Sequence, residues 1–407
     1  MADRFPGGVI SKTPPEIVAP VDGEGGSASG VWTLDEQLGL QKAGSWPKPV
    51  LPRELYAWGS GGSGRLGQND LISKSSPVQV GSLTNWSDVN TGLAHTLAIK
   101  TDGTLWAWGE NNIGRLGDGS SIDKSSPVQI GALTNWSQVA AGNNSSAAIK
   151  TDGTLWTWGS ADRGQLGNNI SGILNSRSSP IQVGALSNWS QVSMVYRFCH
   201  AIKTDGTLWA WGINSSGYLG TGNTVSRSSP VQIGALTNWS TVSHGQYHTL
   251  SIKTDGTLWA WGSASNGALG NNAPFGTFPS PIQVGSLTTW AQASGGRDFT
   301  IATTVNGALY AWGQNTNGAL GDETRVNKSS PIQVGALTDW SQVSGGVRHS
   351  SAIKTDGTLW SWGDNSPSGQ LGIGDVIDRS SPVQVGALNT WMLISMGALH
   401  GMAITKG

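Results

Sequence analysis

The sequence predicts an all-β fold, a seven-bladed β-propeller made of four-stranded blades. Three observations predict it. A Trp-Gly pair recurs seven times at a period near 50 residues, and a second tryptophan recurs seven times between the pairs. Each repeat holds four short segments of strand composition, separated by Gly, Asn and Asp turns. The first and last segments each lack partners from their own repeat, as expected of a ring whose two ends meet.

The two tryptophan sets show where the repeat is rigid and where it varies. The Trp-Gly pairs start at Trp58, Trp108, Trp158, Trp211, Trp261, Trp312 and Trp362. The second set is Trp86, Trp136, Trp189, Trp239, Trp290, Trp340 and Trp391. The interval from the second set to the next Trp-Gly pair is always 22 residues, whereas the interval onward from a pair varies from 28 to 31. Loops accept insertions and packed strands do not, so the varying interval should contain a surface loop.

One repeat illustrates the predicted strands, which cover 105–108, 128–130, 137–140 and 147–150. Asp-Gly dipeptides, such as Asp102-Gly103, predict tight hairpin turns between two of them. The tryptophans are expected to fill the space between wedge-shaped blades. Pairing of the segment 402–405 with 55–58 should close the ring, which places the propeller at residues 54–407.

Composition argues against several classes of protein. The net charge is −1 and 12% of residues are charged, which argues against a nucleic-acid partner. The single cysteine, Cys199, cannot form an internal disulfide. No apolar run reaches 18 residues, so we expect no membrane insertion. The first residues lack the pattern of a secretory signal, so we expect a chain made in the cytoplasm without a signal peptide.

Residues 1–53 stand outside the repeat. Prolines and a Gly/Ser run predict extended backbone. Thr33 and Glu36 form a capping box that predicts one short helix near 34–43. Two interpretations stay open: a flexible leader, or an arm that anchors the chain to a partner. In the second, the anchoring residues are Phe5, Val9, Ile10, Trp32, Leu34, Leu38 and Trp46.

Two motifs of the repeat resemble those of the regulator-of-chromosome-condensation family of seven-bladed propellers. One is Trp-Gly followed by Asn-x-x-Gly-x-Leu-Gly, at 111–117 and 315–321. The other is Gly-x-x-His before a strand, at 92–95, 245–248, 346–349 and 397–400. The resemblance spans 55–406 and implies the fold, but propellers host many unrelated activities. Guanine-nucleotide exchange, known in the family, relies on a wedge-like insertion, and no repeat here gains more than three residues.

A second resemblance concerns the N-terminal segment. The stretch 4–11, with Thr13-Pro14-Pro15 and the stretches 27–36 and 44–47, resembles the leader of structural proteins from tailed phages of marine bacteria. This resemblance implies that residues 1–53 attach the chain to a virus particle.

No residue pattern predicts catalysis, a cofactor or a metal site. Four of the six histidines share one repeat position: His95, His248, His349 and His400. The ring would place them on different blades, so a hydrogen-bonding role is favoured over a metal site, which needs converging ligands. His200 and His244 stand alone, without a cysteine or carboxylate at ligand spacing. Nucleophile motifs, phosphate-binding loops and paired carboxylates are missing too, so we expect no enzyme.

A cation precedes six of the seven Ser-Pro segments. These residues are Lys74, Lys124, Arg177, Arg227, Lys328 and Arg379. In a ring they would form a cationic annulus able to dock an anionic polymer. The alternative is that each one covers its own blade or pairs locally, since long basic side chains often pack through their stems.

One face of the ring carries most of the variation. If strands alternate in direction, the long loops after each Trp-Gly pair share a face with the Gly-x-x-His turns. Aromatic and arginine residues at irregular loop positions are typical of recognition surfaces. The predicted ligand face consists of Tyr196, Arg197, Phe198, Tyr218, Tyr247, Phe275, Phe278, Arg297 and Arg348.

The favoured hypothesis is a non-enzymatic phage virion structural protein. Residues 1–53 would bind other virion proteins, and the propeller would face outward as a decoration or as a module that binds a glycan or protein of the host surface. The chain would then reside at the surface of the particle. The alternative is an intracellular protein-interaction scaffold, or a guanine-nucleotide exchange factor of the chromosome-condensation regulator type.

Overall fold

The computed structural model describes residues 17–18, 27–28 and 52–406. The chain divides into two units, Met1–Pro52 with Gly407, and Arg53–Lys406. In the first unit, strands β1 (Ile17–Val18) and β2 (Ser27–Ala28) pair antiparallel. The helix expected near 34–43 lies outside the described residues. So do the anchoring residues predicted at Phe5, Val9, Ile10, Trp32, Leu34, Leu38 and Trp46.

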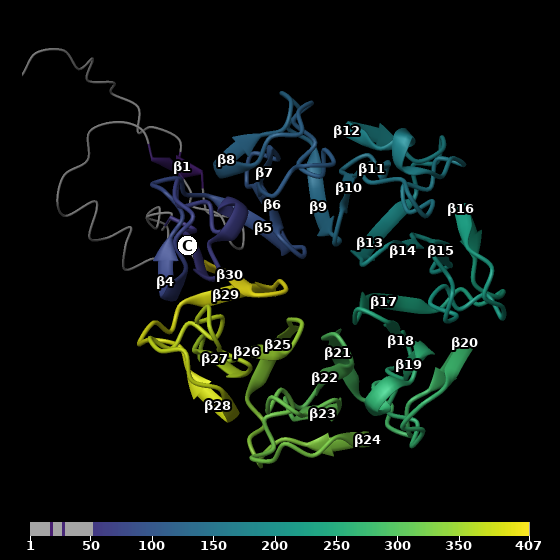
Figure 1. The fold of residues 1–407 in the computed structure, drawn as a ribbon, viewed down its shortest axis with the longest axis vertical. Helices are drawn as coiled ribbons and strands as arrows, with labels where there is room; N and C mark the ends of the chain where they lie inside the picture. Colours follow the sequence, from purple (N-terminus) through teal and green to yellow (C-terminus); the bar gives the residue numbers. More distant parts are fainter. Residues whose placement is uncertain (1–16, 19–26, 29–51, 407) are drawn as a thin grey trace, which may run out of the picture. The chain divides into compact units, whose positions relative to one another are not determined.

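The second unit consists of seven four-stranded antiparallel sheets set radially around one axis (Figure 1). This confirms the predicted propeller. Outward from the axis, the first three blades are β5 (Trp86–Thr91), β6 (His95–Lys100), β7 (Leu105–Gly109), β8 (Lys124–Gln129); β9 (Trp136–Ala141), β10 (Ser145–Lys150), β11 (Leu155–Gly159), β12 (Arg177–Gln182); and β13 (Trp189–Val195), β14 (Phe198–Lys203), β15 (Leu208–Gly212), β16 (Arg227–Gln232).

The next three blades repeat that order. They are β17 (Trp239–His244), β18 (His248–Lys253), β19 (Leu258–Ser263), β20 (Thr277–Gln283); β21 (Trp290–Gly295), β22 (Phe299–Thr304), β23 (Leu309–Gly313), β24 (Lys328–Gln333); and β25 (Trp340–Gly345), β26 (His349–Lys354), β27 (Leu359–Gly363), β28 (Arg379–Gln384). Three short 3-10 helices lie in the long loops: η1 (Gly62–Gly64), η2 (Ile173–Asn175) and η3 (Ser265–Gly267). No helix in the described part of the chain has the length and apolar character needed to cross a membrane.

The last blade joins the two ends of the propeller, as predicted. It contains β29 (Trp391–Met396), β30 (His400–Thr405), β3 (Leu55–Gly59) and β4 (Lys74–Gln79). Strands β30 and β3 pair antiparallel, with Leu55 opposite Ile404 and Gly59 opposite His400. The pairing removes two sheet edges that an open ring would expose.

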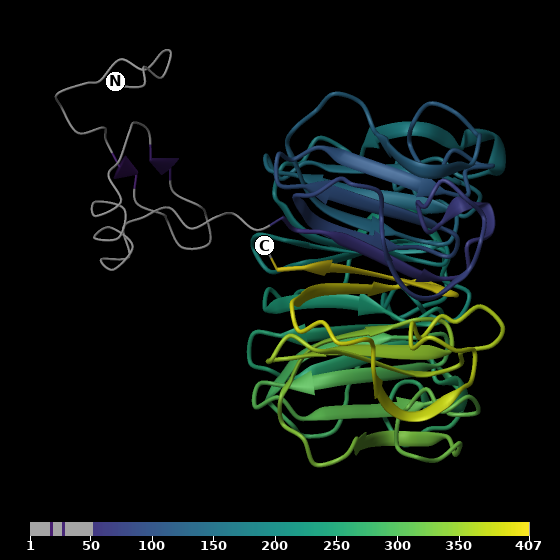
Figure 2. The same cartoon turned by 90° about the vertical axis from the view of Figure 1, so that its left-hand side faces the viewer.

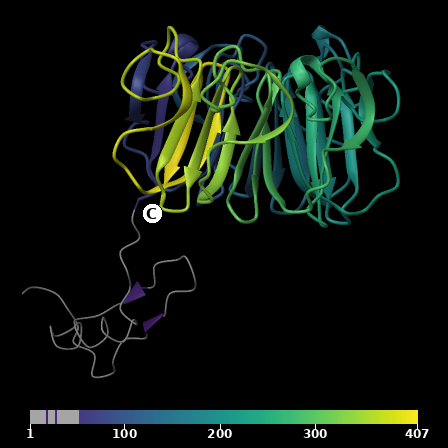
Figure 3. The ribbon, with the colours of Figure 1, turned by 90° about the horizontal axis from the view of Figure 1, so that it is seen from below.

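Strand direction gives the ring two different faces. One, here called the loop face, carries the Gly-x-x-His turns between the first and second strands and the long loops between the third and fourth. The other, the Asp-Gly face, carries the Asp-Gly turns. Because β3 begins and β30 ends at the Asp-Gly face, both Arg53 and Lys406 lie there, opposite the loop face (Figures 2 and 3).

Every Trp-Gly tryptophan joins its blade to the preceding one. The Trp158 indole N–H donates to the Arg115 carbonyl of the preceding blade's long loop at 2.8 Å, and the Ser146 hydroxyl donates to the same carbonyl at 2.7 Å. The same indole bond, at 2.8–3.0 Å, recurs at Trp58, Trp108, Trp211, Trp261, Trp312 and Trp362. All seven indoles are fully buried, which explains the constant spacing of the set.

The Asp-Gly turns are held by their own side chains. Asp102 accepts hydrogen bonds from the Thr104 amide at 2.9 Å and the Thr104 hydroxyl at 2.6 Å. The Thr104 hydroxyl in turn accepts the Trp106 indole N–H at 2.9 Å. Hydrogen bonding from the Thr104 hydroxyl and then its amide lowers the pKa of Asp102. The aspartates therefore stabilise the tight hairpin turns that the Asp-Gly dipeptides predict.

The glycine of the Leu-Gly motif lies against the indole of the next blade. Gly117 has φ +83°, and a Cβ placed there would lie 2.8 Å from Trp158 Nε1. Gly131 also has a positive φ, +65°, but its Cβ would meet nothing within 4 Å. A side chain at either position would be strained by the positive φ, but only one at Gly117 would also clash with a neighbouring side chain.

We expect Gly117→Ala to lower the free energy of unfolding by about 3 kcal/mol, because backbone strain adds to displacement of a buried indole. Gly131→Ala should cost about 1 kcal/mol from strain alone. Urea denaturation of the two variants measures the difference. Equal losses would show that the contact with Trp158 has no energetic role.

Candidate functional site

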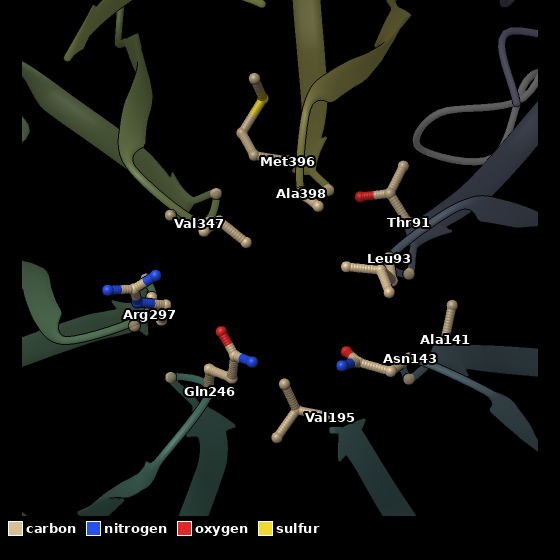
Figure 4. Close-up of a pocket in the computed structure, with 18 residues that line it drawn as sticks. Thr91, Leu93, Ala141, Asn143, Val195, Gln246, Arg297, Val347, Met396 and Ala398 are labelled. Carbon is tan, nitrogen blue, oxygen red and sulfur yellow. The ribbon is translucent and has the colours of Figure 1, made fainter. Parts of the chain in front are cut away.

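A pocket lies on the propeller axis at the loop face, and all seven blades line it (Figure 4). Its volume is about 450 Å³, with the open solvent at its mouth included. Side chains around it include Leu93, Asn143, Gln246 and Val347, with Gln246 and Asn143 directed inward in Figure 4. Glycines of the turns make up much of the remaining wall, so the backbone comes close to the axis.

The turns that form this wall are bonded to one another. The amide of Gln246 donates to the Gly296 carbonyl at 2.9 Å, and the amide of Arg297 donates to the Val347 carbonyl at 3.1 Å. The Leu93 amide donates to the Gly142 carbonyl at 3.3 Å. Each bond joins neighbouring blades, so these side chains start from a preorganised backbone.

One repeat position at this mouth holds a different residue in every blade. It is the position after the glycine of the Gly-x-x-His turn, or its equivalent. The residues are Leu93, Asn143, Tyr196, Gln246, Arg297, Val347 and Ala398. The sequence prediction missed most of them, although aligning the seven repeats would have revealed the position.

Five residues of the predicted ligand face have partly or fully exposed side chains near these turns. Tyr196 and Tyr247 form an edge-to-face pair with ring centroids 5.7 Å apart. Arg197 pairs with Asp162 at 3.4 Å, and Arg297 with Asp298 at 3.0 Å. Arg348 is exposed. This mixture of aromatic and arginine side chains suits protein recognition.

Four residues of the predicted ligand face lie elsewhere. The expectation that Phe198 and Tyr218 are surface residues is wrong, since they are 0% and 6% exposed and stack in the core with centroids 5.2 Å apart. Phe278 is partly buried and packs against the core cluster that its blade shares with the next one. Phe275 is 74% exposed but lies in the outer loop before β20, away from the residues that line the axial pocket.

The histidines have structural roles. His95 Nε2 bonds to the Ser146 hydroxyl and His248 Nε2 to the Thr300 hydroxyl, each at 2.9 Å, across a blade boundary. Burial lowers the pKa of His248 to about 3. The described residues contain no cluster of three or more His, Cys, Asp or Glu able to hold a metal ion.

A buried histidine pair is a contact that sequence spacing did not predict. His200 Nδ1 lies 2.9 Å from His244 Nε2 of the next blade, and His244 Nδ1 lies 2.8 Å from the Ser193 hydroxyl. Phe198 contacts both rings edge-on. Burial lowers the pKa values of both histidines, so both stay neutral at physiological pH.

Local pairing accounts for most of the predicted cationic annulus. Lys74 pairs with Asp70 at 2.9 Å, Lys124 with Asp118 at 3.5 Å and Lys328 with Asp322 at 3.6 Å. Arg379 pairs with Asp375, and Arg177 donates to two carbonyls of its own loop. Within the described residues only Arg227 of the six has no such partner. The local alternative therefore describes five of these side chains.

Among the seven innermost strands of the described propeller, only β5 contains a carboxylate, Asp88. In four blades a glutamine of the innermost strand accepts the backbone N–H of the next blade, as Gln138 Oε1 does from Val192 at 2.9 Å. Asp88 takes this position in β5 and accepts from Val139 at 3.2 Å. Many protein atoms surround the Asp88 carboxyl, although the residue keeps partial solvent exposure. This burial raises the pKa of Asp88 to about 6.

Asp88 should therefore make stability depend on pH. The pKa of Asp88 in the folded protein lies above its unfolded value near 3.9, so protonation of Asp88 favours the folded state. This contribution to the free energy of unfolding is lost as pH rises through about 6. Asp88→Gln keeps the acceptor without the charge. We expect the variant's stability relative to wild type to increase by about 2 kcal/mol between pH 4 and pH 8. Chemical denaturation at both pH values tests this, and a pH-independent difference would contradict it.

The repeats of this chain match a known family of repeats. Seven stretches match the family model described as the regulator of chromosome condensation (RCC1) repeat: residues 54–99, 102–149, 152–202, 205–252, 255–303, 306–353 and 356–404. A second model of the same repeat matches five stretches between 86 and 370.

Solved structures of similar fold include human WBSCR16, with a TM-score of 0.79 and 20% identity over 87% of this chain and 99% of that one. Prp20p from Saccharomyces cerevisiae, studied for its binding to Gsp1p and histones, gives 0.76 and 20% over 88% and 92%. Yeast RCC1 (Prp20) bound to Kap60 gives 0.77 and 19% over 88% and 89%. At these identities the similarity shows the fold alone.

Proposed function

Because this chain belongs to the regulator of chromosome condensation repeat family, we propose that it is a non-catalytic protein-binding propeller. Its loop face would bind a protein partner around the axial pocket. The pocket supplies a small concave centre, and Tyr196, Tyr247, Arg297 and Arg348 supply a rim of recognition side chains. Hydrogen bonds between blades hold the turns, so binding orders little backbone.

The observation that carries the proposal is the turn position with seven different residues. A residue needed only for packing would repeat from blade to blade, as the tryptophans and turn glycines do. This position differs in all seven blades and the next position holds six different residue types, whereas the glycine before them recurs in six of the seven blades. A ring of equivalent blades can recognise an asymmetric partner only if the blades present different side chains to it, as they do at these turns.

The printed descriptions of two related structures favour a protein partner, since they name Gsp1p, histones and Kap60 for yeast Prp20. Nucleotide exchange is a narrower activity within this class. Each blade of the described propeller has four strands and no additional one that could act as a wedge. We therefore favour an interaction scaffold over an exchange factor.

Site-specific photocrosslinking tests the proposal. p-Benzoylphenylalanine in place of Gln246 reports on the pocket, and the same residue in place of exposed Thr288 reports on the Asp-Gly face. In extract from the organism that makes the chain, the Gln246 probe should crosslink one dominant protein that the Thr288 probe does not. Crosslinking of the same protein only from position 288 would contradict the proposal. Accelerated release of labelled GDP from Gsp1p by this chain would instead favour the exchange activity.

Attachment to a phage particle is a second candidate, supported by the leader resemblance of residues 1–53. The described propeller begins at Arg53 on the Asp-Gly face, so residues 1–53 would connect to the propeller on the face opposite the loop face. In this candidate the partners are virion proteins and a host-surface glycan or protein. Mass spectrometry should find the chain in purified particles, and deletion of residues 1–50 should remove it from them. Normal incorporation of the truncated chain would refute the anchor.

A further inference from the structure

An open groove, about 1,130 Å³ with the solvent at its mouth included, lies between the outermost strand β8 of one blade and the next blade, whose β9, β10, β11 and β12 each contribute to its lining. Its walls include the partly buried indole of Trp156, the ring of Pro180 and the exposed Gln129. It is separate from the axial pocket, with which it shares no lining residue.

The ammonium group of Lys150 lies in this groove without a counter-ion. It sits 4.8 Å from the ring centre of Trp136 and 3.9 Å from that of Trp156. Lys150 is 7% exposed. Among the described residues no side chain or carbonyl forms an ion pair or a hydrogen bond with its ammonium. The stem of Lys150 is therefore buried, while its ammonium keeps some contact with solvent and is open to an anionic ligand.

The arrangement recurs around the ring. Lys203 and Lys253 are also 7% exposed and lie 3.7 Å from the centres of Trp209 and Trp259. Two further lysines at this position differ: Lys100 is less buried and lies 4.7 Å from the centre of Trp106, and Lys354 pairs with Asp339 at 3.3 Å. In two further blades threonine and tyrosine replace the lysine and the tryptophan, at 304 with 310 and at 405 with 56.

We propose that the groove at Lys150, and the equivalent lysine–indole sites at Lys203 and Lys253, bind the acidic sugar units of an anionic polysaccharide. The lysine would pair with a carboxylate of the sugar. The indole and proline surfaces would contact the C–H face of the pyranose ring, while Gln129 and Ser179 would meet its hydroxyl groups. Equivalent sites on one rigid ring favour a ligand whose units also repeat, since weak sites add through multivalency.

Charge density favours a saccharide over a nucleic acid. A nucleic acid carries one phosphate per nucleotide and binds tracks of several cations. The groove at Lys150 offers one unpaired ammonium, because its other lysine, Lys124, pairs with Asp118 at 3.5 Å. The chain as a whole has a net charge of −1.

Isothermal titration of the full chain with trigalacturonate tests the proposal. We expect binding with quenching of tryptophan fluorescence, and at least tenfold weaker binding of maltotriose and of the trimethyl ester of trigalacturonate. The triple variant Lys150→Met, Lys203→Met, Lys253→Met should lose most of the binding, since methionine keeps the packing of the stem without the charge. The charge-matched variant Arg163→Met, Arg325→Met, Lys406→Met should bind as wild type does.

Equal binding of the ester and the acid, or retention of binding by the folded triple variant, would overturn the proposal. Tighter binding of a mixed-sequence single-stranded DNA 12-mer than of trigalacturonate would overturn the choice of ligand. The comparison of acid with ester uses wild-type protein, so it decides the question even if the triple variant fails to fold. Loop-face crosslinking is measured separately, so either proposal can fail alone.

Discussion

Deletion of residues 400–407 is expected to abolish cooperative unfolding of the propeller. Strand β30 lies between β29 and β3 and joins the two ends of the ring. Its Met402, Ala403 and Ile404 side chains are completely buried. Without them the ring loses one wall of a blade core and exposes two new sheet edges. The loss should exceed about 5 kcal/mol, which is comparable to the whole stability of many domains.

Calorimetry checks this expectation, with deletion of only residues 406–407 as the control. The control keeps β30 and should unfold in one transition near the wild-type temperature. The longer deletion should show no single cooperative transition and should bind a dye specific for exposed apolar surface. A single transition within a few degrees of the control would show that closure contributes little.

Replacing Trp158 with alanine should lower the free energy of unfolding by about 4 kcal/mol. The indole is fully buried, contacts Trp136 edge-to-face at 6.4 Å, and donates to the preceding blade. Trp158→Phe keeps an aromatic ring but removes the donor. It should cost about 2 kcal/mol, because Ser146 still satisfies the Arg115 carbonyl.

Trp156 provides a matched control in the same strand. It is only partly buried, and its indole N–H bonds within its own turn, to Thr154 at 2.9 Å. Trp156→Ala should therefore cost clearly less than Trp158→Ala, about 1–2 kcal/mol. Urea denaturation of the three variants gives the comparison. Equal losses at positions 156 and 158 would contradict the role assigned to the bonds between blades.

The architecture could be predicted because it follows from a period. Seven copies of one unit with a constant 22-residue interval leave few arrangements, and the incomplete first and last segments indicate where the ring closes. The structural role of the turn aspartates could also be predicted from a local pattern, because Asp102 and Thr104 are neighbours in sequence.

Contacts between blades could not be predicted in the same way. The pair of His200 with His244 depends on which side of each strand faces the next blade. The burial of Phe198 and Tyr218 has the same cause, since a loop position in sequence can point into the core. Local ion pairs, by contrast, could have been predicted from the sequence. An aspartate lies four to six residues before each of Lys74, Lys124 and Lys328, and this spacing predicts that the charges of these three lysines are paired locally.

Hydrogen exchange of the propeller, with and without the protein captured through Gln246, tests the central claim most directly. The loop-face turns around residues 93, 246 and 297 should exchange more slowly in the complex. The Asp-Gly turns around 102, 152 and 255 should be unchanged. Protection confined to the Asp-Gly face, with none at the axial pocket, would contradict the assignment of the loop face as the binding surface.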